Sequence, residues 1–528
     1  SKILTEMLFI SLIVALFSVA NALSKVQLTQ FEENGKRHFV EKDTGRQIFF
    51  HGVNAIVKGF PYVPLTSEFD IDVSLVDKDH QYLADIGVNV YRLGAMWVGA
   101  EPKEGQFNQT YFDELKLITH QASKYGIYTL LDMHQDVISE KTCGEGVPDY
   151  AAIPKAQDFP APIDDVFTDI ATDGYPTRQD CAKHNWPQYY NTRSASSIFQ
   201  NLYNNVTTPG STLQYWSRFW ETVAKEFKNE QSVIGYELIN EPWAGDIFNE
   251  PKLLLPSVAD RENLQPAYDY ITDNIRKIDT ESLIAFAAVT WDDPIAAGFS
   301  HAPGSDVNAA TQSIFAYHFY EPPQYTVHHY FKTREADAAR LQTASMLTEF
   351  ERPTNDDDIE NDLFVKAANV ADEYLLSWMI WEYKTFCRET EASLSSNSQA
   401  AEFGSCKTGY GEHLFWNDNG EINPLASKKM ARTYAQKVSG RTERMHFNPE
   451  TRSFELVYLA NTAIKEPTEI FASVKYQYPE GYDVTLLPKG KVFSKQVSEN
   501  IVGVYANKAL LADGEKVIVR ITPKSATN

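Results

Sequence analysis

The sequence predicts an α/β fold, a parallel (β/α)₈ TIM barrel, followed by a C-terminal antiparallel β-sandwich. Short apolar runs of strand length alternate with helical runs over most of the chain, and eight such runs precede residue 384. This alternation indicates a parallel sheet, and a (β/α)₈ barrel carries its functional residues at the carboxyl ends of the strands. Polar residues stand at the ends of these runs. From about Gly440 the pattern changes to short alternating strands separated by Pro, Gly and Asn, which is typical of an antiparallel sandwich.

The N-terminus has the pattern of a secretory signal peptide. Lys2 precedes an apolar run over residues 7–19, and Ala20-Asn21-Ala22 follows with the small residues of a cleavage site after Ala22. A membrane anchor is the alternative, but the run is shorter than the about 20 apolar residues of a spanning helix. We therefore expect export, either to the outside or to a lysosomal or digestive compartment.

The domains are expected in three parts, and the barrel strands follow in chain order. The parts are a signal peptide at 1–22, the barrel with a hairpin-like N-terminal cover at 23–438, and the sandwich at 439–528. Barrel strands are expected at 49–54, 89–93, 128–133, a run ending at 241, 283–289, 313–318, a run ending at 349, and 377–383. Helices are expected at 74–85, 111–125 and 213–227, and C-terminal strands at 454–459, 472–476, 501–505 and 516–521.

Composition narrows the class of function. A chain of 528 residues, 43% of them hydrophobic, can bury a large core and has room for a barrel of about 250 residues beside a second domain. The formal charge of −23 disfavours nucleic acid as a partner, because phosphate binding uses clustered Lys and Arg. Solubility is the simpler reason for this acidity. The other reason would be adaptation to an acidic compartment, where protonation of carboxylates relieves the repulsion between them.

Export gives the four cysteines a structural role. Cys143, Cys181, Cys387 and Cys406 allow three pairings. We expect Cys143–Cys181 and Cys387–Cys406, because each pair lies within one expected loop. The sequence has neither a Cys-x-x-Cys nor a His-x-x-x-His spacing, so we expect no zinc site.

Two sequons mark possible glycosylation. Asn108 and Asn205 each begin an Asn-x-Thr acceptor sequence, and such sequences are modified on the surface of exported proteins.

Two expected strands end on a glutamate. Glu241 follows an apolar run that begins at Ser232, and Glu349 closes a second run 108 positions further on. A carboxyl group buried at a strand end is costly unless it is hydrogen-bonded or used in chemistry. Two such groups suit a retaining glycosidase, in which one glutamic acid protonates the leaving oxygen and one carboxylate attacks the anomeric carbon. The competing interpretation is that each glutamate only forms salt bridges at its strand end. That interpretation explains a single glutamate, but it explains less well why two strands end in this way.

These motifs resemble family 5 of the glycoside hydrolases, in clan A. The residues that carry the resemblance are Asn240-Glu241-Pro242-Trp243-Ala244-Gly245 and Leu347-Thr348-Glu349-Phe350, and within the family the chain is most similar to the endoglycoceramidases, from about Gly52 onward. The resemblance implies that Glu241 is the acid/base, that Glu349 is the nucleophile, and that no cofactor or metal is needed. An amide beside the acid, here Asn240, can hydrogen-bond the hydroxyl next to the anomeric carbon.

Further polar residues end the other expected strands. Arg92 is always charged, so inside a barrel it should brace a carboxylate, in the first place Glu349. His318 and Tyr320 point the same way by strand alternation, and the resemblance places them against the acid and the nucleophile. The resemblance also implies sugar contacts for Lys58, Asp132 and His134, and a stacking platform at Trp381. Ordinary packing, structural hydrogen bonds and, for Lys58, a solvated loop are the alternatives.

The loops distinguish between β-glycoside substrates. Leu253, Leu254 and Leu255 follow one another between two prolines, and an exposed apolar loop marks lipid or protein contact. The alternative is that the leucines fold back onto a helix. With the resemblance, they predict part of a channel for a ceramide tail, which the long insertion at 137–186, with its Phe159-Pro160-Ala161-Pro162, would help to wall.

The function expected from these features is hydrolysis of the β-linkage between the oligosaccharide and the ceramide of a glycosphingolipid. The enzyme would touch a membrane or micelle surface transiently. A secreted β-glucanase or β-mannanase is the second enzymatic interpretation. A third interpretation is a non-catalytic glycolipid-binding protein. The presence of both glutamates argues against it, because a carrier gains nothing from an acid and a nucleophile.

Overall fold

The structure is a computed structural model in which residues 23–30, 35–153, 181, 184, 186–290, 295–320, 326–386 and 414–524 are described. The expected signal peptide, the Cys387–Cys406 pair and the Phe159-Pro160-Ala161-Pro162 segment lie outside these residues. In the described part of the chain, no helix has both the length and the apolarity to cross a bilayer.

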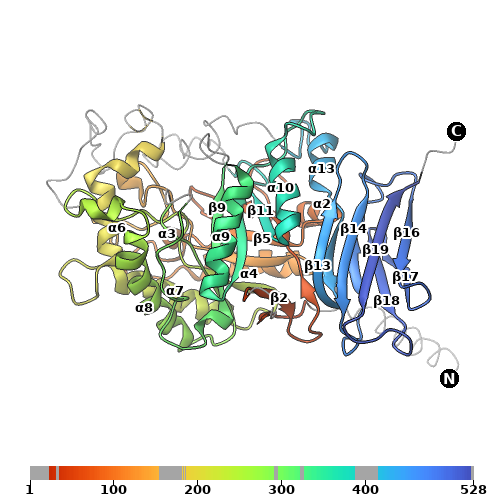
Figure 1. Ribbon diagram of the computed structural model, residues 1–528. Helices are drawn as coiled ribbons and strands as arrows, with labels where there is room; N and C mark the ends of the chain where they lie inside the picture. Colours follow the sequence, from red (N-terminus) through yellow and green to blue (C-terminus); the bar gives the residue numbers. More distant parts are fainter. Residues whose placement is uncertain are drawn as a thin grey trace, which may run out of the picture.

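An eight-stranded parallel barrel forms the larger part of the molecule, as the sequence predicts (Figure 1). It closes in the order β10-β11-β4-β5-β6-β7-β8-β9. The strands are β4 (His51–Ala55), β5 (Val90–Gly94), β6 (Tyr128–Asp132), β7 (Val233–Glu237), β8 (Leu283–Phe286), β9 (Ser313–Phe319), β10 (Ala344–Phe350) and β11 (Ser377–Ile380). All eight expected strands are present, but β7 ends four residues before Glu241.

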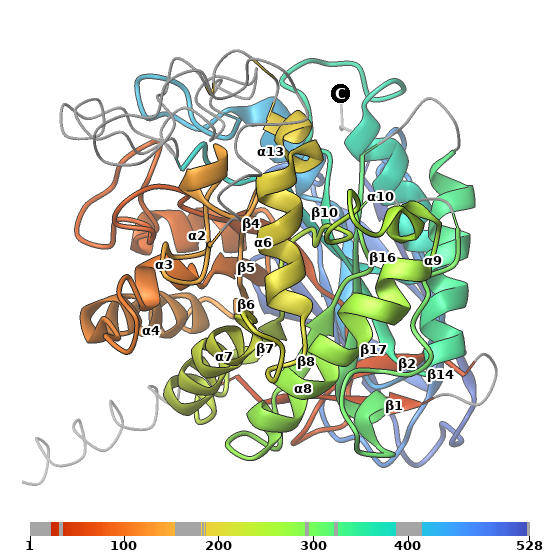
Figure 2. The same cartoon turned by 90° about the vertical axis from the view of Figure 1, so that its left-hand side faces the viewer.

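Helices surround the barrel (Figure 2). They are α2 (Asp77–Asp85), α3 (Trp97–Ala100), α4 (Gln109–Ser123), α6 (Arg193–Tyr203), α7 (Leu213–Phe227), α8 (Gln265–Arg276), α9 (Val327–Leu341), α10 (Leu363–Tyr374) and α13 (Pro424–Met430). Several begin at a residue whose side chain accepts a hydrogen bond from the first turn. Asn108, Thr326 and Asp362 cap α4, α9 and α10 in this way, which is why these helices start where they do.

The expected N-terminal cover lies beneath the barrel and also belongs to a sheet at the other end of the chain. Its strands are β1 (Val26–Gln30), β2 (Arg37–Glu41) and β3 (Gln47–Ile48). Val26, Phe39 and Ile48 pack with the apolar side chains that fill the lower barrel interior. Strand β3 also pairs antiparallel with β12 (Tyr434–Val438), Ile48 lying opposite Lys437.

The strands of the C-terminal region, drawn in blue at one side of the barrel in Figure 1, belong to two antiparallel sheets. The seven-stranded sheet has the order β1-β2-β3-β12-β15-β18-β17, and the four-stranded sheet β13-β14-β19-β16. The remaining strands are β13 (Gly440–Phe447), β14 (Phe454–Ala460), β15 (Thr468–Phe471), β16 (Tyr482–Leu487), β17 (Val492–Ser498), β18 (Ile501–Ala506) and β19 (Lys516–Pro523). Burial alternates along β14, as expected of a sheet with one covered face.

Two expectations about this region differ from the structure. The C-terminal strands of the seven-stranded sheet begin with β12, before residue 439, because β3 of the cover pairs with it. The strand expected at 472–476 is wrong: there the chain turns, and the amides of Gln477 and Tyr478 both donate to the carbonyl of Ser473 at 3.0 Å. Of the apolar residues that suggested a strand, Ala472 and Tyr476 are buried from this turn and Val474 is half-buried.

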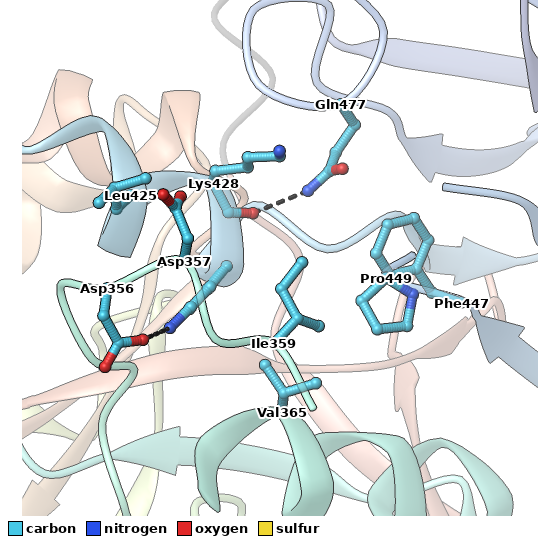
Figure 3. A pocket seen from close by; sticks show the side chains of 10 residues that line it. Asp356, Asp357, Ile359, Val365, Leu425, Lys428, Phe447, Pro449 and Gln477 are labelled. Atoms are coloured by element: carbon cyan, nitrogen blue, oxygen red, sulfur yellow. Dashed lines mark hydrogen bonds and ion pairs between the residues drawn. The ribbon is translucent and has the colours of Figure 1, made fainter. Parts of the chain in front are cut away.

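A hollow of about 450 Å³, counted with the solvent at its mouth, lies where α13, the loop after β10 and the C-terminal region meet (Figure 3). Gln477 donates from Nε2 to the carbonyl of Lys428 at 2.7 Å. The buried Lys429 ammonium donates to Thr354 and Asp362 at 2.7 Å each. These bonds attach the loop that follows Glu349 to the C-terminal region.

Candidate active site

Glu241 and Glu349 lie together at the carboxyl end of the barrel. Glu349 is inside β10, one residue from its end, whereas Glu241 stands in the loop after β7 with a left-handed φ of 39°. That conformation is unfavourable for a residue with a side chain. Gln135 holds the loop there, since its Nε2 donates to the carbonyls of Asn240 at 2.7 Å and Glu241 at 3.1 Å.

The two carboxyl groups are close. One side-chain oxygen or ring nitrogen from each of Glu241, His318 and Glu349 lies within 4.8 Å of the others. Retaining glycosidases have carboxyl groups about 5 Å apart, and inverting ones about 6.5 Å or more, to make room for a water. The separation is therefore that of a retaining enzyme. By distance alone these three side chains form the one group among the described residues that has the spacing of a metal site.

His318 and Tyr320 hold both carboxyl groups. His318 Nδ1 lies 2.8 Å from Glu241 Oε1 and 3.4 Å from Glu349 Oε2. The Tyr320 hydroxyl donates to Glu349 Oε2 at 3.0 Å and so fixes the orientation of that carboxyl group. Burial lowers the pKa of His318, so the neutral imidazole is favoured.

Arg92 is completely buried and forms the centre of a second set of contacts. Its Nη1 donates to Glu349 Oε1 at 2.7 Å, its Nε to Glu237 Oε2 at 2.7 Å, and its Nη2 to Asn240 Oδ1 at 2.8 Å. Asp132 Oδ2 lies 3.1 Å from Nη2. Burial alone would lower the pKa of Arg92, but the surrounding carboxylates outweigh it and raise the pKa above its usual range.

Sequence reasoning missed two members of this set. Glu237 ends β7 and Asn54 lies on β4, where its Oδ1 accepts from Arg92 at 3.0 Å. Burial raises the pKa of Glu237, and Arg92 opposes this effect. The available signal was a glutamate at the end of the apolar run before Asn240, where only the later Glu241 was given a role.

The environment of Glu241 suits a proton donor. Removal from bulk water raises the pKa of its carboxyl group to about 7, and the negative charge of Asp136 adds to the effect. A general acid with such a pKa still carries its proton near neutrality.

A polar wall with an aromatic platform stands beside the acid. His134 stacks on Trp381 with ring centroids 5.3 Å apart, and Lys58 Nζ lies 4.8 Å from the centre of the same ring. Lys58 pairs with Asp136, and His134 Nδ1 lies 2.8 Å from Asp132 Oδ2. Burial would lower the pKa of His134, but its hydrogen bonds to Asp132 and Asp136 raise it to about 9. Such a wall offers both charged hydrogen-bonding groups and a flat apolar face to a sugar ring.

All ten residues expected at the site are joined in one network of contacts: Lys58, Arg92, Asp132, His134, Asn240, Glu241, His318, Tyr320, Glu349 and Trp381. They come from seven of the eight barrel strands and the loops that follow them. The barrel is what brings them together, because in the sequence they are spread over more than three hundred positions.

The loops around the site carry other expected features. Leu253 is buried, whereas Leu254 and Leu255 are 56% and 58% exposed. A disulfide joins Cys143 to Cys181, with their Cα atoms 5.5 Å apart. Asn108 and Asn205 are both exposed.

Comparison with known proteins agrees with this geometry. A family model described as cellulase (glycosyl hydrolase family 5) matches residues 70–386, and one for the glycoside hydrolase family 5 C-terminal domain matches 432–521. An endoglycoceramidase of Cyanea nozakii is 40% identical over 484 residues, 91% of each chain. One of Hydra vulgaris is 37% identical over 487 residues, 92% of this chain and 88% of the relative.

Among solved structures, endo-glycoceramidase II from Rhodococcus sp. is similar in fold. Its iminocyclitol complex has a TM-score of 0.69 at 19% identity, covering 91% of this chain and 98% of the other. Its ganglioside GM3 complex has a TM-score of 0.67 at 18% identity, covering 94% and 100%.

Proposed function

This chain belongs to glycosyl hydrolase family 5 and, within it, to the endoglycoceramidases, and from this membership we propose that it cleaves the β-glycosidic bond between the oligosaccharide and the ceramide of glycosphingolipids. The observation that carries the proposal is the pair Glu241 and Glu349: their carboxyl oxygens lie within 4.8 Å, burial raises the pKa of Glu241, and Arg92 donates to Glu349. The ganglioside complex of the Rhodococcus protein supports the substrate class.

The first step forms a glycosyl-enzyme. The carboxylate of Glu349, held by hydrogen bonds from Arg92 and Tyr320, attacks the anomeric carbon as the bond from that carbon to the ceramide oxygen breaks. Glu241 gives its proton to the departing oxygen, so that ceramide leaves as an alcohol. Asn240 lies beside Glu241, where its amide can hydrogen-bond the neighbouring sugar hydroxyl.

The second step releases the oligosaccharide. Glu241, now a carboxylate, takes a proton from water as the water oxygen attacks the anomeric carbon and the ester to Glu349 breaks. Two displacements at one carbon retain its configuration. Every proton and bond is accounted for by the two glutamates and one water, so the proposed mechanism uses no cofactor.

The lipid side of the substrate has a matching surface. Leu254 and Leu255 expose apolar side chains on the loop that follows Glu241, while Leu253 anchors that loop in the core. We assign the two exposed leucines to transient contact with a membrane or micelle from which ceramide is drawn. The apolar leader at 7–19 and the Cys143–Cys181 disulfide support export to an oxidising compartment.

Product analysis tests the proposal. The purified protein is incubated in mild detergent with a ganglioside and, separately, with soluble β-glucan and β-mannan, and the products are identified by mass. Intact oligosaccharide plus free ceramide is the expected result. Sugar release from the polysaccharides alone would assign the glycosidase to the second substrate class and remove the lipid role of the leucines.

A further inference from the structure

Glu145 is a buried carboxyl group behind the Lys58–Asp136 pair, and the mechanism above leaves it without a role. It lies on the hairpin that follows β6, where its amide donates to the carbonyl of Asp136 at 2.8 Å and its carbonyl accepts from the amide of Asp136 at 3.3 Å. Only 1% of the residue is exposed. Glu145 therefore cannot touch a substrate directly.

The hairpin is built to bring Glu145 against Asp136. A Cβ atom at Gly144 would lie 1.9 Å from the carbonyl oxygen of Asp136, and one at Gly146 would lie 2.5 Å from that of His134. Side chains would force these backbones apart, so the two glycines flanking Glu145 permit the approach. The residue before Gly144 is Cys143, which the disulfide fixes.

The contacts of Glu145 are those of a neutral acid. Lys58 pairs with Asp136, and its Nζ is 3.4 Å from Glu145 Oε1. Within the described residues, neither carboxyl oxygen of Glu145 has a hydrogen-bond donor. A buried carboxylate without donors is costly, and one ammonium cannot compensate two adjacent carboxylates. A protonated Glu145 can instead donate its own hydroxyl to the Asp136 carboxylate.

Of the two adjacent carboxyl groups, Glu145 is the one whose surroundings favour the protonated form. Burial, and then the charge of Asp136, raise the pKa of Glu145 well above its usual value. Burial acts on Asp136 too, but Lys58 and His134 outweigh it and hold its pKa below the usual range. Glu382 and Glu241 also face this cluster. Glu382, in the loop after β11, helps to raise the pKa of Lys58 through its charge, and Glu241 has its own pKa raised by the charge of Asp136.

We infer that Glu145 is a positioning residue for sugar binding: as a neutral acid it donates a hydrogen bond to Asp136 and so holds the Asp136–Lys58 pair against Trp381. The inference rests on the proposed function, in which Lys58 and Asp136 bind the sugar. Loss of its proton would place a second anion beside Asp136. Binding of the sugar then weakens at alkaline pH through a group other than Glu241.

The test compares Glu145→Gln with the wild type. Glutamine keeps the shape and an N–H donor but cannot ionise. The substrate is 4-nitrophenyl β-lactoside, because its leaving group departs without a proton and so reduces the demand on Glu241. KM and kcat are measured from pH 5 to 10. His134, with a pKa of about 9, loses its proton in both proteins over this range. We therefore expect the wild-type KM to rise more steeply at alkaline pH than the KM of Glu145→Gln, with both proteins similar at pH 6. Parallel KM profiles would overturn the inference.

Two further variants complete the test. Glu145→Leu removes the donor, and we expect KM to rise at least about tenfold with kcat within about threefold of wild type. Glu140→Gln is the matched control, since Glu140 is on the same hairpin but accepts from Tyr62 at 3.2 Å, and it should leave the profile unchanged. An unchanged KM in Glu145→Leu would also contradict the inference. If Glu145→Leu does not fold, the glutamine comparison decides. Failure of the wild type to cleave both ganglioside and lactoside would instead refute the proposed function.

Discussion

Arg92 donates a hydrogen bond from Nη1 to Oε1 of Glu349 at 2.7 Å, reaching across the barrel from β5 to β10. Both side chains are almost fully buried, and the same guanidinium also pairs with Glu237. Because one cation pairs with three carboxylates, Asp132 among them, the position of Glu349 and the stability of the barrel depend on the same side chain.

Replacing Arg92 with Met should lower both stability and activity. Removing one partner from a buried ion pair typically costs about 3–5 kcal/mol, because the remaining charge is left uncompensated. We expect a lower Tm in thermal unfolding and kcat/KM below about 1% of wild type. In the double variant Arg92→Met/Glu237→Gln, Tm should recover in part and activity should not. Full activity in either variant would show that Glu349 does not need this cation.

Glu349→Gln should abolish turnover and leave the fold intact. An amide cannot form the glycosyl ester, and loss of a catalytic nucleophile lowers kcat by about a thousandfold or more. Tm and binding of the oligosaccharide should stay close to wild type. Glu360→Gln is the control, an exposed glutamate in the loop after the same strand. Residual activity within a few-fold of wild type would exclude Glu349 as the nucleophile.

Activity on a glycolipid should fall as pH rises through about 7. Glu241 must carry a proton to protonate the ceramide oxygen, and its pKa is raised to about 7. Since the charge of Asp136 contributes to that shift, Asp136→Asn should move the alkaline limb of kcat/KM to lower pH. The same shift lowers stability as pH rises from about 4.5 to 7, because the folded protein holds the proton more tightly. An alkaline limb that does not move in Asp136→Asn would contradict this assignment.

Replacing both Leu254 and Leu255 with Ser should affect only substrates presented in a lipid surface. Both side chains are largely exposed, so Tm should change little. Loss of two half-inserted leucines should raise KM for a micellar ganglioside about tenfold, and KM for soluble 4-nitrophenyl β-lactoside should stay the same. The contrasting variant is Leu253→Ser, which buries a hydroxyl in the core and should lower Tm. Equal effects on both substrates would assign the leucines to folding instead.

The barrel was predictable because its strands are short apolar runs that end on polar residues, and the same pattern singled out Glu241 and Glu349. The exact place of Glu241 was not predictable. Its strand ends at Glu237, and the next four residues form a loop that Gln135 holds through two carbonyls. A prediction from the apolar pattern extends the strand to the last apolar residue. It cannot show where the backbone stops pairing with the neighbouring strands.

Contacts between residues far apart in the sequence also could not be predicted. Lys437 continues a sheet whose neighbouring strand contains Ile48, and local composition carries no sign of this partner. Similarly, the run at 472–476 has the apolar residues of a strand, but it buries them from a turn. Glu237 was overlooked for a related reason, since the partner that explains it, Arg92, is 145 positions away.

The pairing of β3 with β12 also sets the order of events during synthesis. Ile48 leaves the ribosome about 390 residues before Lys437, which at roughly 5–20 residues per second is about 20–80 s. For that time β3 lacks its neighbour, but a strand of only two residues offers other chains little to pair with. Lys437 lies beyond all eight barrel strands. The seven-stranded sheet can therefore be completed only after nearly the whole chain has been translated.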